Sequence, residues 1–126
     1  MSDRSERQTA APGRSPVTGV LPWLGVGLLL AATGVLLWRA GTEERLVQFD
    51  VRQAWLPSGL ACLWGVMGLA RPGGNRRAAW CLIAASAILA ATALVLDQFN
   101  LLVEYHRWLE RGMPAPWQWG GGAPKP

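Results

Sequence analysis

Residues 78–96, AAWCLIAASAILAATALVL, decide the fold of this chain because they contain no charged side chain over 19 positions. An α-helix rises about 1.5 Å per residue, so a helix of this length crosses a hydrocarbon layer of about 30 Å. Two similar stretches precede it, since residues 15–38 carry no charge over 24 positions and residues 53–70 carry none over 18. We therefore predict three membrane-spanning helices, at about residues 21–38, 55–70 and 78–96.

The composition supports a membrane protein. Charged residues make up 16% of the chain, against about 25% in soluble proteins. The 12 basic and 8 acidic residues all lie outside the three stretches. A soluble helical bundle needs charges on the outer face of each helix, whereas these helices are apolar on every side. The expected fold class is an all-α integral membrane protein with three antiparallel transmembrane helices, followed by a C-terminal amphipathic helix.

The net charge of +4 indicates a membrane orientation rather than a nucleic-acid partner, because the basic residues gather at helix ends. Six of the twelve lie in the N-terminal tail and in the loop 71–77, RPGGNRR, which has three arginines and no acid. The two sides of the membrane tie at six basic residues each, and the density of the arginine loop breaks the tie. We expect a bacterial inner-membrane protein with its N-terminus in the cytoplasm and its C-terminus outside.

The first apolar stretch could instead be a cleaved signal peptide. Its apolar part, residues 20–38, is longer than the usual 7–15 residues, and no A-x-A cleavage site follows it. We therefore expect an uncleaved anchor. Cys62 and Cys81 lie at different depths of adjacent spans, so we expect them to be packing residues and not a disulfide.

The segments outside the spans differ in character. Residues 1–16 and 112–126 are polar or rich in Pro and Gly, and we expect both tails to be disordered around a membrane domain of residues 17–111. Apolar residues recur with a helical period after Asp97, which predicts an amphipathic helix over about residues 98–111. It either continues the third span or lies on the membrane surface. Residues 47–51 alternate with period two, but a lone strand has no partner, so we expect an extended segment there.

Two groups of residues are candidates for contact with a partner protein. Small residues let helix backbones approach closely in lipid. The small-residue candidates on the second and third spans are Ala61, Gly65, Gly68, Ala84, Ala87 and Ala91. The polar candidates near the outer end are Asp97, Glu104, His106 and Arg107.

The chemistry of the chain argues against an enzyme or a transporter working alone. The predicted spans contain no ionisable group apart from the two cysteine thiols, and we expect their hydroxyls to bond to their own helix carbonyls. There is no phosphate loop, CxxC, HExxH or nucleophile elbow. His106 is the single histidine and has no nearby Cys or His to complete a haem or metal site. We predict no catalytic residue, metal or cofactor.

The function that these observations favour is a non-catalytic accessory or assembly subunit of a larger membrane complex, for instance an energy-transducing one. Its partners would be the lipid bilayer and the helices of other membrane subunits or of further copies. A self-assembling pore of the holin type is one alternative. A membrane anchor that contributes a quinone contact through Asp97, His106 and Arg107 is another.

Overall fold

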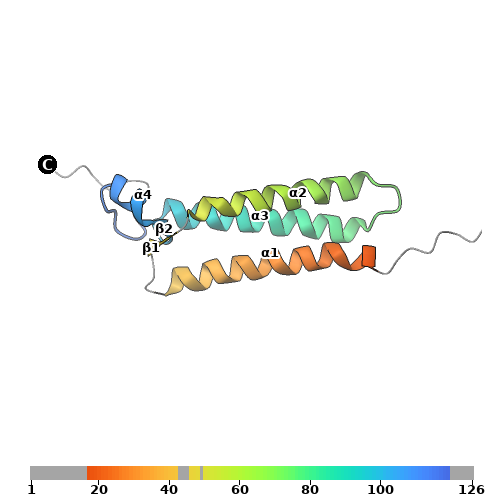
Figure 1. Ribbon diagram of the computed structural model, residues 1–126, viewed down its shortest axis with the longest axis horizontal. Coiled ribbons are helices and arrows are strands. Elements are labelled where there is room, and N and C mark those ends of the chain that lie inside the picture. Colours follow the sequence, from red (N-terminus) through yellow and green to blue (C-terminus); the bar gives the residue numbers. More distant parts are fainter. Residues whose placement is uncertain (1–16, 43–45, 49, 120–126) are drawn as a thin grey trace, which may run out of the picture.

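The computed structural model describes residues 17–42, 46–48 and 50–119, and it is mostly helical (Figure 1). Three long helices lie side by side, and the shorter elements gather at the end of the bundle where α3 ends. The elements in chain order are α1 (Val17–Gly41), β1 (Leu46–Val47), the 3₁₀-helix η1 (Val51–Ala54), α2 (Trp55–Ala70), α3 (Arg76–Gln98), β2 (Val103–Glu104) and α4 (Tyr105–Glu110).

A tight turn joins α2 to α3 and makes them antiparallel (Figure 1). Gly73 has a φ of 76°, in the left-handed region that glycine adopts without a steric cost. The Gly74 amide donates to the Arg71 carbonyl at 3.1 Å. The Asn75 side chain then caps α3 by accepting from the Ala78 amide at 3.2 Å. The helix α2 thus ends at Ala70, directly before this turn.

The third helix forms the core of the bundle, because α1 and α2 both pack against it. Its buried side chains form one continuous face of the helix, which includes Leu82, Ser86, Leu89, Ala93 and Leu96. On α2, Gly65 lies so close to α3 that an added Cβ would meet Ile83 Cγ1 at 2.6 Å. The two helices can therefore approach this closely only where α2 has no side chain.

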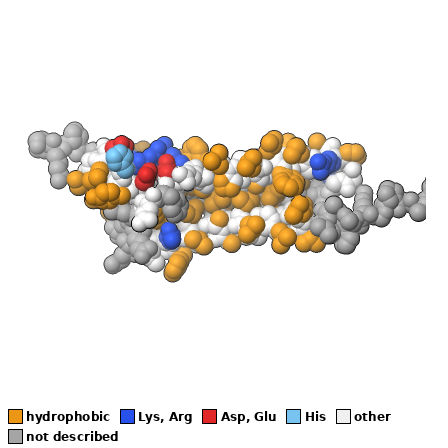
Figure 2. All heavy atoms as spheres, in the orientation of Figure 1, with side chains coloured by type: hydrophobic (Ala, Val, Ile, Leu, Met, Phe, Trp, Pro, Cys, Tyr) orange, Lys and Arg blue, Asp and Glu red, His pale blue; other side chains and the backbone are white. Residues whose placement is uncertain are grey.

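The outer surface of the bundle is apolar along its length. Figure 2 shows hydrophobic side chains over the middle of the molecule, and charged side chains only toward its two ends. Leu28 on α1 is 73% exposed and Leu60 on α2 is 69% exposed. Two helices, residues 19–41 of α1 and the whole of α3, are long and apolar enough to cross a membrane. With 16 residues, α2 is shorter.

The helix bounds follow the sequence prediction closely. The predicted range 55–70 coincides with α2, while α1 and α3 extend the predicted ranges 21–38 and 78–96 by a few residues at each end. One consequence concerns Pro22, the second residue of the predicted range 21–38. It lies inside α1 because the helix begins at Val17, and it removes one backbone hydrogen bond there.

Two expectations about the segments outside the helices are wrong. The amphipathic helix predicted over 98–111 is reduced to the six residues of α4, because the chain turns at Asn100 (φ 55°) and buries Leu101 and Leu102 in the core. The segment expected to lack a strand partner has one, since β1 pairs in parallel with β2 and brings Leu46 opposite Val103. Of the predicted disordered tails, residues 1–16 and 120–126 lie outside the described residues, whereas residues 112–119 are described and contact the end of α3 through Trp117 and Trp119.

Candidate functional site

A buried carboxylate lies where the last turn of α3 ends. The Asp97 side chain is 2% exposed, and two arginines from distant parts of the chain bind it. Arg52, from η1, places Nε and Nη2 each 3.0 Å from Oδ2. Arg111, just after α4, donates from Nη2 to both carboxylate oxygens at 3.0 Å. We call Arg52, Asp97 and Arg111 the Asp97 cluster.

Local structure positions both arginines. The Asp50 side chain caps η1 by accepting from the Arg52 amide at 2.9 Å, which fixes the start of that helix. Arg111 Nη1 donates to the Asp97 carbonyl at 2.8 Å and to Asn100 Oδ1 at 3.1 Å. The carbonyl of a helix's last turn has no partner within the helix, and here the Asp97 carbonyl accepts from the Asn100 amide at 3.3 Å as well as from Arg111. The cluster thus ties the first loop and the C-terminal segment to the end of α3.

A second ion pair reinforces this connection. Arg107 Nη2 on α4 lies 3.5 Å from Asp50 Oδ2. Arg107 Nη1 is buried and has no hydrogen-bond partner in the described part of the chain. Aromatic rings close the same end, where Phe99 packs against Trp117 at 5.9 Å and Trp119 at 5.2 Å between ring centroids. The Trp117 amide also donates to the Phe99 carbonyl at 2.8 Å.

The geometry makes the Asp97 cluster a static connection rather than a reactive group. Both oxygens of Asp97 accept hydrogen bonds from guanidinium groups. Arginine stays protonated in proteins, so neither arginine can accept a proton from Asp97 if Asp97 acted as a general base. Within the described residues, no group of three or more His, Cys, Asp and Glu side chains could hold a metal ion. The cluster can therefore hold the first loop and the C-terminal segment against the end of α3, but it offers no free carboxylate for catalysis.

The polar residues singled out from the sequence do not form one site. Asp97, a candidate for contact with a partner protein or a quinone, is buried between two arginines. His106 lies on the surface and contacts Glu110 at 3.3 Å. Arg107 pairs with Asp50 and not with Glu104, which lies in β2.

Sequence reasoning missed Arg52 and Arg111 as the partners of Asp97. The available signal was weak: an aspartate at the end of an apolar stretch and arginines next to predicted helix ends. The separations of 45 and 14 residues are set by the tertiary fold, so no local pattern identifies the pairs.

The small residues divide into two sets. Those on α2 face the rest of the bundle: Gly65 is buried against α3, an added Cβ at Gly68 would lie 3.4 Å from Ala79 Cβ, and Ala61 packs against the core. Those on α3 face outward. This second set is Ala84, Ala87 and Ala91, all exposed on the side of α3 opposite its buried face.

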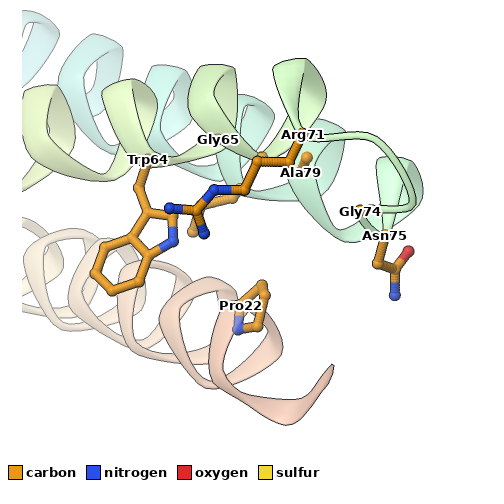
Figure 3. Close-up of a pocket in the computed structure, with 9 residues that line it drawn as sticks. Pro22, Trp64, Gly65, Arg71, Gly74, Asn75 and Ala79 are labelled. Carbon is orange, nitrogen blue, oxygen red and sulfur yellow. The ribbon is translucent and has the colours of Figure 1, made fainter. Parts of the chain in front are cut away.

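A groove opens between α1 and α2 at the other end of the bundle (Figure 3). Its polar end has a volume of about 130 Å³ and is lined by Arg71, Gly74 and Asn75, together with Trp64 and Pro22. Its apolar continuation has a volume of about 310 Å³ and shares Pro22, Trp64 and Leu82 with the polar end. The groove is thus cationic at one end and apolar along the rest.

Comparison with known proteins adds no relative, since no family model matches the chain and neither the curated proteins nor the solved structures give a significant match.

Proposed function

We propose that this chain is an integral membrane protein with three spans, and that it serves as a non-catalytic accessory or assembly subunit of a larger membrane complex. The observation that carries the proposal is the outward-facing apolar surface of the whole bundle, with charge confined to the two ends (Figure 2). Contiguous apolar surface of this extent is unfavourable in water and favourable in lipid or against other helices. The membrane we propose is a bacterial inner membrane.

The length of α2 is compatible with a third span. Its 16 residues rise about 24 Å, and the four residues of η1 that run directly into it add about 8 Å, which together match a hydrocarbon core of about 30 Å. The added turn contains Arg52, whose charge is paired with Asp97. Charged residues near membrane depth are tolerated when they pair in this way.

The outward face of α3 supports contact with another helix. Ala84, Ala87 and Ala91 lie on the exposed side of a helix whose opposite side is already buried by α1 and α2. A small-residue face gains little from contact with lipid chains, but it lets a partner helix approach closely. This face would contact a helix of the partner subunit. The polar residues around α4 and the Asp97 cluster would contact the outer domain of the same subunit.

Other observations favour this function over its two alternatives. A holin-type pore needs polar groups free to face a lumen, yet three of the four hydroxyls in the predicted spans, those of Thr33, Ser58 and Ser86, each donate to a backbone carbonyl four residues earlier. A quinone contact needs Asp97 to be accessible, and it is buried.

The experiment is extraction of the full-length protein in a mild detergent, followed by mass spectrometry of the co-purifying proteins. We expect a partner membrane protein at fixed stoichiometry. The double variant Ala84→Leu/Ala87→Leu should reduce its recovery at least about fivefold, because the added side chains hold the partner backbone away. The matched control is Leu60→Ile, on the exposed face of α2, which should leave recovery unchanged. A homo-oligomer with a water-filled lumen would favour the pore, and a monomer without a partner would refute a subunit role.

A further inference from the structure

We infer that the groove between α1 and α2 binds one anionic phospholipid, with the lipid phosphate on Arg71 and an acyl chain along the apolar continuation. This inference rests on the membrane location in the proposed function, but not on the existence of a partner protein. It follows from the shape of the groove, its length and the charge at its end.

The polar end of the groove has the donors that a phosphate needs. In Figure 3 the Arg71 side chain runs back along α2 toward Trp64, so that its guanidinium group lines the pocket. A guanidinium group presents N–H donors in a planar fork that matches two phosphate oxygens. Asn75 lines the same pocket, although its side-chain oxygen is already used by the Ala78 amide.

The apolar continuation runs along the two helices. It begins at Pro22 and Trp64 and reaches Leu28 on α1 and Ala61 on α2. Seven residues separate Leu21 from Leu28 along α1, which corresponds to about 10 Å at the helical rise, or about two thirds of one leaflet of a hydrocarbon core of about 30 Å. A chain lying here would run parallel to the helices, as acyl chains do in a bilayer.

The charge at this end is complementary to an anion and is not neutralised by the described residues. Arg71, Arg76 and Arg77 take part in none of the ion pairs within the described part of the chain. The described acids, Asp50, Asp97, Glu104 and Glu110, all belong to elements at the opposite end of the bundle. Basic pockets between helices at a membrane surface are recognised sites for anionic head groups.

The N-terminal tail is the competing occupant, since it contains Asp3 and Glu6 and precedes α1 at this end. It is a poor counter-charge, because residues 1–16 also carry three arginines and are net positive. The head group of phosphatidylglycerol carries a negative phosphate and no cation. This lipid is therefore the probe of choice.

The test is native mass spectrometry of the full-length protein equilibrated with equal amounts of phosphatidylglycerol and phosphatidylcholine. We expect one phosphatidylglycerol to be retained in preference to phosphatidylcholine. Arg71→Gln should weaken its retention about tenfold, as expected for loss of a hydrogen-bonded charge. Arg77→Gln removes the same charge from the first turn of α3, outside the groove, so retention of phosphatidylglycerol should change less than twofold. Ala61→Phe fills the groove and should also lower retention. Leu24→Phe is a second groove variant, because Leu24 is exposed and tolerates a larger ring.

Five outcomes would overturn the inference. Equal retention of the two lipids, or equal losses in Arg71→Gln and Arg77→Gln, would show only general attraction to a basic loop. Displacement of the lipid by millimolar inorganic phosphate would indicate a site for free anions. A gain of lipid in Asp3→Asn/Glu6→Gln would show that the tail occupies the groove. Full retention in both groove variants would show that no acyl chain lies there. A partner protein found without lipid preference would refute only the lipid site, whereas a soluble, detergent-free monomer would refute both proposals.

Discussion

Asp97 illustrates how a single residue can hold two distant segments in place. A carboxylate buried to this degree is unfavourable unless it is paired, because burial removes it from water. Here Arg52 and Arg111 supply the pairing, and neither arginine is fully buried itself, with exposed side-chain fractions of 38% and 18%. The desolvation penalty therefore falls mainly on Asp97, and the loss of its charge would leave two cations close together.

The variant Asp97→Asn tests this at the residue scale. It keeps the size of the side chain but removes the charge, and we expect it to lower the free energy of unfolding by about 2–3 kcal/mol. The measurement is denaturant unfolding in detergent micelles, with tryptophan fluorescence as the probe. Glu110→Gln is the control, because it breaks only the exposed pair with His106 and should change the free energy by less than about 0.5 kcal/mol. Equal effects of the two variants would mean that the Asp97 cluster adds no stability.

At the scale of the element, the close contact between α2 and α3 depends on Gly65. Three glycines lie along α2, at positions 59, 65 and 68, and they face different surroundings. An added Cβ at Gly65 would meet Ile83 Cγ1 at 2.6 Å and the Ala79 carbonyl oxygen at 3.0 Å, whereas at Gly59 it would meet nothing within 4 Å. Only the tertiary packing distinguishes these two positions.

Gly65→Ala should therefore destabilise the protein by about 1–3 kcal/mol, the usual range for overpacking a well-filled contact. Gly59→Ala should have almost no effect, and it serves as the matched control on the same helix. Ile83→Ala removes the nearest obstructing atom. The double variant Gly65→Ala/Ile83→Ala should therefore lose less unfolding free energy than the sum of the losses in the two single variants. Similar stabilities of the two glycine variants would contradict the close approach of α2 and α3.

The arrangement of three alternating helices makes a prediction at the scale of the whole molecule. The described chain passes along the bundle three times, since α1 and α3 run in one direction and α2 in the other (Figure 1). If each passage crosses the membrane, then the two ends of the chain lie on opposite sides. Both ends on the same side would be incompatible with this arrangement, because α1 and α3 run in the same direction and the chain must cross back between them.

Reporter fusions distinguish these cases. A fluorescent protein that matures only in the cytoplasm should report at the N-terminus but not after Pro126, and alkaline phosphatase should be active only after Pro126. This orientation follows from the density of arginines in the loop 71–77, which we place in the cytoplasm. The opposite pattern at both ends would reverse the orientation, and cytoplasmic signals at both ends would exclude a third span.

The sequence by itself determined the long helices, because each is a continuous apolar stretch and its bounds depend on local features such as proline, glycine and the first charged residue. It could not determine the pairing of β1 with β2, the shortness of α4 or the partners of Asp97. These features depend on contacts between residues 14 to 57 positions apart along the chain, such as Asp97 with Arg111 and Leu46 with Val103. Local patterns carry no information on such distances. Likewise, the small residues of α2 and α3 look alike in sequence, and only the packing of the three helices decides that Gly65 is buried while Ala87 remains exposed.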